Sequence, residues 1–588
     1  MKPDMVAAQL AASPSRLGLV RARFKERGVD VLLVRATDRY LNEYVPDDES
    51  TRLWLTGFSG SAGDALVFAD ALHLFVDGRY TLQASQEVPD AVVTTAKTGQ
   101  SIEGAWLDLL AAHARGLRVG VESDRLSVAM MRLLSQRAAK DGWTLVPLLP
   151  SPVEEVRGPL PPSSAPTSFW PIEPALAGRS VRDRLALGAP LLDEHDLHGL
   201  LVCALDELAW ITNLRGDQFP YQATLRATAL VTRDLALVDA DTAALRRDRP
   251  VEDVVSFVEA GGLWSKVSPG MRLGIDPSTT PHAVAEALLA RGAVLIEVQS
   301  PYALLRTKKT AAELAHMQAA FARADGVIDD VQRWLAKQLG KGRVVTEAGV
   351  AQKTEELFRA SGAFGLSFKV ISAAGANGAV IHYSTPDPKR RVKKGEIFLL
   401  DTGAYYEGGY ATDLTRTFLA GPSTTKATKQ QQRLYTAVLK AAIAGMSARV
   451  PVGVTGEQLD CIVREQLWRF GLDYGHGTGH GVGVNVHEAP PSVRIGNRGT
   501  VEPGQVFSIE PGVYLPGWGG IRIENLCTVV ADPVSQRAGV PRAFLRVKPL
   551  TFSPLDRRLV DRAMLTPYEK RFLAWFARGS GKTLPPTA

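Results

Sequence analysis

The chain has 588 residues, of which 45% are apolar and 22% are charged, with a formal net charge of +6. These proportions are those of ordinary globular proteins, and they exclude a collagen-like chain, a disulfide-rich scaffold and a wholly disordered chain. A charge of +6 over this length is too dilute to indicate nucleic acid binding. The three cysteines are far apart in the sequence, which excludes a zinc-ribbon cluster and favours a reducing compartment.

The sequence also predicts where the protein is located and how many domains it has. No apolar run reaches the ~18 residues that a membrane span requires. The first residues are too polar to form the core of a signal peptide, so we expect a cytoplasmic protein. At roughly 100–200 residues per domain, the length predicts three to five domains.

A proline-rich stretch divides the first half of the chain. Eight of the 36 prolines lie between residues 150 and 174, which predicts a linker over 151–175 without a helix or a central strand. Before it, the pattern predicts strands at 29–34, 65–68 and 72–76 and a helix at 81–87. After it, the pattern predicts a helix at 181–192 and strands at 200–205, 227–231 and 235–238.

The two sides of this stretch resemble each other. The segment Leu53-Trp54-Leu55-Thr56, followed by Asp77, is echoed by Ala209-Trp210-Ile211-Thr212, followed by Asp239. The echo predicts two related α/β domains in tandem, over 12–150 and 176–305.

A third region, 306–560, alternates long helical patterns with strands. We expect helices at 310–334, 347–360, 429–448 and 456–470, and strands at 397–400, 506–509 and 521–530. Within 561–588, Thr566-Pro567 and Glu569 form a typical helix start, which predicts a docked helix at 567–577.

Four carboxylates lie at strand ends in this third region. Asp401 and Glu510 each follow a run of apolar residues, and Asp413 opens another strand-like segment. Glu524 lies within 521–530, where strand alternation places Arg522 on the same face. Because a lone buried carboxylate is costly, each of these side chains needs a partner or a cation.

A histidine completes a set of candidate metal ligands. His480 lies in the glycine-rich segment His476–Gly483 and adds one nitrogen to the four carboxylates. Such a set suits two divalent ions, Mn²⁺, Co²⁺ or Zn²⁺, rather than a thiolate site. Two such ions can share carboxylates and activate a water near neutral pH.

These motifs resemble the pita-bread metallopeptidases, and most closely the large three-domain aminopeptidases P. The C-terminal motifs indicate the wider family, and the N-terminal ones indicate the aminopeptidase P group. The latter are Gly57–Gly63, Asp77-Gly78-Arg79-Tyr80, Leu205–Trp210 and Asn213–Gly216. The resemblance implies two tandem creatinase-N-terminal-like α/β domains followed by a pita-bread catalytic domain.

The resemblance also implies roles for individual residues. Asp401 would bind one metal ion, Asp413 and Glu524 would bridge both, and His480 and Glu510 would complete the second site. Glu510 would also transfer protons. The other implied roles are stabilisation of the tetrahedral intermediate by His382, substrate contacts from His476, His487 and Arg79, and hydrogen bonding around Asp401 by Arg522 and Tyr514.

One spacing departs from the family pattern. Asp413 lies twelve residues after Asp401, one more than is usual. A one-residue slip inside a strand would turn a side chain to the wrong face. We therefore expect the extra residue in the turn Tyr406–Tyr410, where two glycines can absorb it.

The implied activity is removal of the N-terminal residue from peptides with proline in the second position. Two divalent ions, most simply Mn²⁺, would be the cofactors, and the enzyme would be a cytoplasmic homodimer. Two alternatives remain open: a prolidase, which cuts only Xaa-Pro dipeptides, and a non-catalytic pita-bread binding module. The intact ligand set argues against the second alternative, and the full-length resemblance argues against the first.

Overall fold

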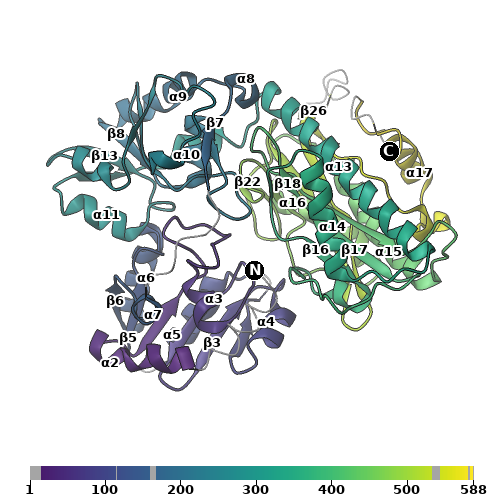
Figure 1. Ribbon diagram of the computed structural model, residues 1–588, viewed down its shortest axis with the longest axis horizontal. Coiled ribbons are helices and arrows are strands. Elements are labelled where there is room, and N and C mark those ends of the chain that lie inside the picture. Colours follow the sequence, from purple (N-terminus) through teal and green to yellow (C-terminus); the bar gives the residue numbers. More distant parts are fainter. Residues whose placement is uncertain are drawn as a thin grey trace. The chain divides into compact units, whose positions relative to one another are not determined.

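The computed structural model describes residues 15–97, 99–113, 115–158, 167–532, 543–579 and 583–586 (Figure 1). The chain forms two compact units. Unit 1 contains the residues up to Ala303 apart from two short segments, 175–178 and 221–223, which belong to unit 2 with the residues from Leu304 onward.

The first sheet of unit 1 has its six strands in the order β4-β3-β2-β1-β5-β6. β1 pairs antiparallel with β2 and parallel with β5. The strands are β1 Val31–Val34, β2 Asp64–Phe68, β3 Leu72–Val76, β4 Val92–Thr95, β5 Arg118–Glu122 and β6 Thr144–Leu148. The helices around them are α2 Phe24–Arg27, α3 Thr51–Thr56, α4 Thr81–Glu87, α5 Ile102–Ala112, α6 Val128–Asp141 and α7 Pro152–Arg157.

This sheet is covered on both faces, which explains why its central strand is apolar throughout. Leu32 and Val34 of β1 belong to one core, and Val31 and Leu33 belong to another on the opposite face. The first core includes residues of α3 and α4, and the second includes residues of α5 and α6. Alternation along the strand divides its side chains between the two.

The second sheet of unit 1 has the same topology, in the order β12-β11-β10-β8-β13-β14. β8 pairs antiparallel with β10 and parallel with β13, as β1 does with β2 and β5. The strands are β8 Gly199–Val202, β10 Thr228–Val231, β11 Ala236–Asp239, β12 Val255–Val258, β13 Arg272–Ile275 and β14 Val294–Glu297. The helices are α9 Val181–Glu194, α10 Leu205–Thr212, α11 His282–Leu289 and α12 Pro301–Leu305.

The tandem repeat is therefore confirmed in the order and direction of the strands. The echoed segments are α3 and α10, and both end on a left-handed residue, Gly57 with φ 79° and Asn213 with φ 53°. The expectation of a strand over 200–205 is wrong at its end, because the strand stops at Val202 and Ala204 is the N-cap of α10.

The proline-rich stretch is more ordered than its composition predicts. Ser151 caps α7, and Pro152 occupies the first turn, where a missing N–H costs no hydrogen bond. β7 Phe169–Pro171 pairs with β9 Leu214–Gly216 in a two-stranded sheet. The prediction that no helix forms in this stretch is wrong, because Ser151 and Pro152 begin α7. Residues 159–166 lie outside the described residues, and the domain boundaries stay predictions.

Unit 2 is built around two larger sheets, β16-β17-β19 and β20-β27-β26-β23-β21-β22. Their strands are β16 Ile371–Ala374, β17 Ile397–Thr402, β19 Leu414–Leu419, β20 Arg449–Pro451, β21 Gly479–Gly481, β22 Glu488–Val493, β23 Val506–Ile509, β26 Asn525–Ala531 and β27 Phe544–Pro549. Two small pairs complete the unit: β15 Gly365–Leu366 with β18 Ala404–Tyr405, and β24 Gly512–Leu515 with β25 Gly519–Arg522.

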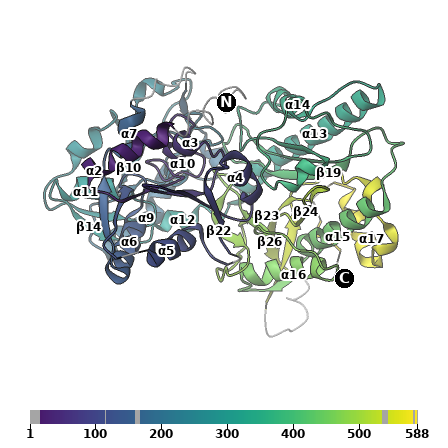
Figure 2. The same ribbon diagram turned by 90° about the horizontal axis from the view of Figure 1, so that it is seen from below.

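The helices of unit 2 cover these sheets and match the predicted ranges closely. They are α13 Ala311–Gly340, α14 Glu347–Ala360, α15 Lys429–Met446, α16 Gly456–Trp468 and α17 Pro567–Phe576. α13 and α14 lie side by side (Figures 1 and 2). Capping boxes begin α13 at Thr310 and α17 at Thr566, the second as predicted from the sequence.

α15 lies close to the strand that leads to Glu510, and a glycine allows this approach. A Cβ at Gly445 would lie 2.7 Å from Cγ2 of Ile509 and 2.8 Å from Cγ2 of Val463. In contrast, a Cβ at Gly326, which is exposed on α13, would meet no atom within 4 Å. The two helical glycines therefore differ in packing, although both weaken a helix in the same way.

We expect Gly445→Ala to lower the midpoint of thermal unfolding and Gly326→Ala to raise it slightly. Both changes add about 0.5–1 kcal/mol of helix propensity. At Gly445 this gain is outweighed by overpacking, which costs about 1–3 kcal/mol in a tight core. Thermal unfolding followed by circular dichroism measures both variants. An equal rise for the two would contradict the close packing of α15.

Candidate metal centre and active site

Two of the carboxylates come from neighbouring antiparallel strands. Asp401 lies near the end of β17 opposite Thr415 of β19, and Asp413 immediately precedes β19. Both side chains belong to buried residues, 7% and 5% exposed. The connection between the strands contains a bridge from Tyr405 to Ala411, which encloses the turn at 406–410. Whether the extra residue of the twelve-residue spacing lies in that turn stays a prediction.

His480 and Glu510 come from the six-stranded sheet. His480 is the middle residue of β21, and Glu510 follows the last residue of β23. Nδ1 of His480 donates to the carbonyl of Gly481 at 3.1 Å, which leaves Nε2 to face the carboxylates. Ser508 donates its hydroxyl to Oε1 of Glu510 at 3.1 Å and accepts the backbone N–H of His480 at 3.0 Å.

Glu524 lies in a break between two strands, which corrects the sequence prediction. The expected single strand over 521–530 is divided into β25, which ends at Arg522, and β26, which begins at Asn525. In the break, the N–H of Ile523 donates to Pro511 and that of Glu524 donates to Thr415. Strand alternation is therefore not what directs Arg522 and Glu524 to the same site.

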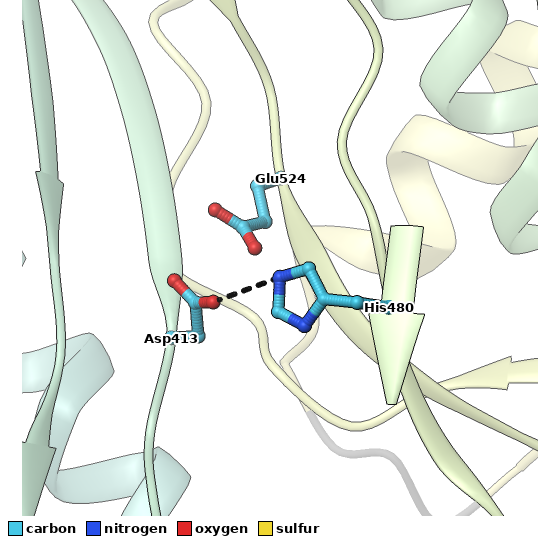
Figure 3. Close-up of side chains that lie close together, drawn as sticks. All are labelled: Asp413, His480 and Glu524. Atoms are coloured by element: carbon cyan, nitrogen blue, oxygen red, sulfur yellow. Dashed lines mark ion pairs between the residues drawn. The ribbon is translucent and has the colours of Figure 1, made fainter. Parts of the chain in front are cut away.

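The five predicted ligands converge although they come from separate segments. Asp413, His480 and Glu524 each offer a ligand atom, and these atoms lie within 4.8 Å of one another (Figure 3). Nε2 of His480 is 3.4 Å from Oδ2 of Asp413 and 3.4 Å from Oε1 of Glu510. Asp401 lies close enough to repel the carboxylates of Asp413 and Glu510, and the guanidinium of Arg522 binds its Oδ2.

The charges of this cluster are poorly balanced by the protein itself. Burial raises the pKa of Asp413 well above its usual range, and repulsion from Asp401 and Glu510 adds to the rise. Burial and the same kind of repulsion raise the pKa of Glu524. Oδ1 of Asp401 and Oε1 of Glu524 are buried and accept no hydrogen bond within the described residues.

This donor set fits divalent cations. Four carboxylates and one imidazole are ligands that Mn²⁺, Co²⁺ and Zn²⁺ accept, and cations would remove the repulsion that raises the carboxylate pKa values. The free oxygens of Asp401 and Glu524 are available as ligand atoms. A cysteine contribution is absent here, since Cys527 is buried and is not part of the cluster that the described residues form.

A chain of hydrogen bonds leads from Asp401 to His476. Arg522 binds Asp401 and donates to the hydroxyl oxygen of Tyr514 at 2.8 Å. Burial raises the pKa of Tyr514 to about 12, so its hydroxyl stays protonated and donates to Nε2 of His476 at 2.8 Å. Nδ1 of His476 donates to Gly477 at 2.7 Å, so both nitrogens of its ring are engaged.

Three further predicted residues, His487, His382 and Arg79, lie outside this chain of hydrogen bonds. The ring of His487 lies 4.3 Å from that of His480, measured between centroids. His382 follows Ile381, whose carbonyl accepts a hydrogen bond from Arg522 at 3.3 Å. Arg79 belongs to unit 1, where it forms a bidentate ion pair with Asp77. Its contact with the substrate stays a prediction.

Two supporting residues were missed by the sequence reasoning. Thr415 donates its hydroxyl to Oε2 of Glu524 at 2.7 Å and accepts Nε–H of Arg522 at 3.0 Å. Ser508 supports Glu510 and His480 as described above. Each lies two residues from a predicted ligand along the chain, so strand periodicity could have identified both.

Models of known protein families match most of the chain. The model of metallopeptidase family M24 matches residues 315–531. The model of the creatinase/prolidase N-terminal domain matches 16–158, and a second model of that description matches 160–313. Among the described residues, no helix is long and apolar enough to cross a membrane.

Individual relatives extend over nearly the whole length. A probable Xaa-Pro aminopeptidase P of Pyricularia oryzae is 34% identical, with 96% of this chain and 94% of the relative covered. A probable Xaa-Pro aminopeptidase P of Fusarium vanettenii is 35% identical, with 97% and 95% covered.

Solved structures give the same pattern. The crystal structure of X-prolyl aminopeptidase from Caenorhabditis elegans, described as a cytosolic enzyme with a di-nuclear active site, superposes with a TM-score of 0.85 at 26% identity and covers 96% of this chain and 94% of that one. Prolidase from Pyrococcus furiosus, at 22% identity and a TM-score of 0.50, covers 63% of this chain and 99% of its own and shares the fold. The chain thus belongs to metallopeptidase family M24 and, within it, to the Xaa-Pro aminopeptidases P.

Proposed function

We propose that this chain is a metal-dependent aminopeptidase that hydrolyses the bond between an N-terminal residue and a following proline. The observation that carries the proposal is the convergence of Asp413, His480 and Glu524 in a chain that matches Xaa-Pro aminopeptidases P over 96% of its length. The position of Glu510 beside His480, at 3.4 Å, adds a carboxylate suited to proton transfer.

The five predicted ligands would hold two divalent ions. Asp401 would bind one ion, His480 and Glu510 would bind the other, and Asp413 and Glu524 would bridge both. Ions in such a site lower the pKa of water toward neutrality and polarise the scissile carbonyl. Mn²⁺ is the proposed metal, because hard oxygen ligands dominate the set; the structure of the C. elegans relative is described as di-nuclear.

The protein's own residues would carry the remaining chemistry. Glu510 takes the proton of the attacking water and delivers it to the nitrogen of the leaving proline. His382 and His487 donate hydrogen bonds to the oxygen of the tetrahedral intermediate and to the substrate. Arg522 and Tyr514 hold Asp401 in place, and His476 and Arg79 contact the peptide in this proposal.

The preference for proline has a chemical basis. The Xaa-Pro bond is a tertiary amide without an N–H, so a peptidase that requires that donor loses a contact. A proline-specific enzyme must recognise the ring without it. We further propose that the enzyme is a cytoplasmic homodimer; the C. elegans relative is described as cytosolic.

We expect His480→Ala to abolish activity and to lower bound metal by about one equivalent per chain, because it removes the only nitrogen ligand. Metal analysis of the dialysed protein and a peptide assay measure both effects. His195→Ala, which changes a histidine at the end of α9 in unit 1, is the matched control. Full activity with unchanged metal content would exclude His480 as a ligand.

We expect Glu510→Gln to leave a folded protein whose turnover is lower by about 10²-fold or more. The amide can still approach a metal ion, but it cannot transfer a proton. Glu502→Gln, which alters a surface glutamate paired with Lys308, serves as the control. Turnover near that of the unchanged enzyme after addition of Mn²⁺ would assign the proton transfer to another group.

A comparison of substrates separates this proposal from a prolidase. A prolidase must close its cleft around the free carboxylate of the substrate proline, whereas an aminopeptidase P must leave room for further residues. We expect cleavage of Xaa-Pro-Pro and longer Xaa-Pro peptides, with little cleavage of Xaa-Ala peptides. The measurement is kcat/KM for an Xaa-Pro dipeptide against an Xaa-Pro-Pro tripeptide. Cleavage of the dipeptide alone would make the enzyme a prolidase.

A further inference from the structure

The segment that carries His382 is attached to the rest of unit 2 by a buried glutamate, Glu347. We propose that Glu347 is a positioning residue, which holds the segment 374–387 so that His382 meets the substrate. This inference rests on the proposed function for the role of His382. The attachment of the segment itself is a property of the structure and can be tested separately.

The side chain of Glu347 receives hydrogen bonds from four points of this segment. Oε1 accepts the backbone N–H of Ala374 at 2.7 Å, and Oε2 accepts the hydroxyl of Tyr383 at 2.9 Å. The amide of Asn377 donates to Oε1 at 3.1 Å and to Oε2 at 3.0 Å. The backbone N–H of Asp387 donates to Oε2 at 3.3 Å. These four residues lie on both sides of His382 in the sequence.

The backbone of Glu347 adds further bonds to residues that flank this segment. Glu347 is the first residue of α14, so its own N–H has no partner within the helix. This N–H donates to the carbonyl of Arg390 at 3.1 Å, and the hydroxyl of Ser372 donates to the carbonyl of Glu347 at 2.8 Å. The start of α14 is therefore joined to the segment by the side chain of Glu347 and to both flanks of the segment by its main chain.

The electrostatic setting shows that these donors are needed. Glu347 is 0% exposed, and the nearby cation Arg390, which interacts with it electrostatically, forms its ion pair with Glu396 instead. Burial raises the pKa of its carboxyl, and the bonds from Ala374, Tyr383, Asn377 and Asp387 oppose that rise. The helix N-terminus also favours a negative charge at this position. A carboxylate stabilised in this way depends on its donors, and the donors depend on it.

The other side of the segment packs against the strand that leads to the metal centre. Arg522, at the end of β25, donates to the carbonyl of Ile381 at 3.3 Å. A Cβ at Gly378 would lie 2.9 Å from the backbone nitrogen of Gly520, so this contact is made between two main chains. His382 therefore lies on a segment fixed by Glu347 on one side and by β25 on the other.

This arrangement predicts that glutamine cannot replace Glu347, although the two side chains have the same shape. In Glu347→Gln, one oxygen can still accept from Ala374 and Asn377. The new NH₂ group would instead face the N–H of Asp387, which can only donate. It would also face the hydroxyl of Tyr383, which already accepts the amide of Asn377 at 3.0 Å and would lose the acceptor for its own O–H. Loss of these two bonds frees the half of the segment that follows His382, and a displacement of about 1 Å at a catalytic group can lower the rate by about 10²-fold.

The test is a double-mutant cycle in the metal-loaded, full-length enzyme. We expect Glu347→Gln to lower kcat for an Xaa-Pro-Pro tripeptide by about 10- to 100-fold with bound metal unchanged. In a His382→Ala background, we expect the same change to lower kcat by less than about threefold, because the group that it positions is gone. Tyr383→Phe removes one of the four contacts and is expected to give a smaller loss that is also absent in the His382→Ala background.

The control is Glu356→Gln, which alters an exposed glutamate of the same helix paired with Lys353. We expect it to leave kcat unchanged. Equal losses from Glu347→Gln with and without His382 would overturn the inference, since they would show a general effect on stability. Loss of metal in Glu347→Gln would also overturn it. If Glu347→Gln does not fold, Tyr383→Phe decides by the same cycle.

Hydrogen–deuterium exchange gives a readout that needs no substrate. We expect faster exchange of the amides of residues 374–387 in Glu347→Gln, with exchange of β23 and β26 unchanged. If the unchanged enzyme does not cleave Xaa-Pro peptides, the proposed function fails, and the exchange measurement still decides whether Glu347 holds the segment. Unchanged exchange in residues 374–387 would overturn the inference.

Discussion

The catalytic unit is organised around the repulsion between four carboxylates in a buried site. At an effective dielectric constant of about 20, two like charges 4 Å apart repel each other by about 4 kcal/mol. Burial is the largest cause of the raised pKa values of Asp413, Glu510 and Glu524, and repulsion from neighbouring carboxylates adds to the rise. Arg522 and His480 offset part of this repulsion. The rest must be balanced by protons or cations, so the same feature that destabilises the empty arrangement gives it affinity for divalent ions.

A site of this kind needs a rigid surrounding, and buried polar groups supply it. Arg416 is 1% exposed and donates to the carbonyls of Thr415, Glu524 and Ser553. It thus fastens β19 to the strand break that carries Glu524. Thr415 and Ser508 then orient the carboxylates themselves. Hydrogen bonds to fully buried groups stay fixed because breaking one leaves an unsatisfied donor or acceptor.

Unit 1 has a different character, because its two halves repeat one topology and lack such a cluster among their described residues. Its first sheet is covered on both faces, and it buries charged groups inside strands, such as Asp64 of β2, which pairs with Arg35. Arg79, which is proposed to contact the peptide, forms an ion pair with Asp77 in this unit. The two models of the creatinase/prolidase N-terminal domain, which match 16–158 and 160–313, together include nearly all of this unit.

The sequence alone predicted the fold class, the tandem repeat, the long helices and the five residues proposed as ligands. The fold class follows from the resemblance to a known family. The helices and the proposed ligands follow from local patterns: helix periodicity, capping residues such as Thr566, and charged residues that end apolar strands. The tertiary structure decided what no local pattern contains. It divided the strand at Ile523 and Glu524, turned Ser151 and Pro152 into a helix start, and gave Glu347 its partners at 374–387. Hydrogen bonds between residues far apart in the chain set these features, since a buried polar group takes its partner wherever packing brings one within reach.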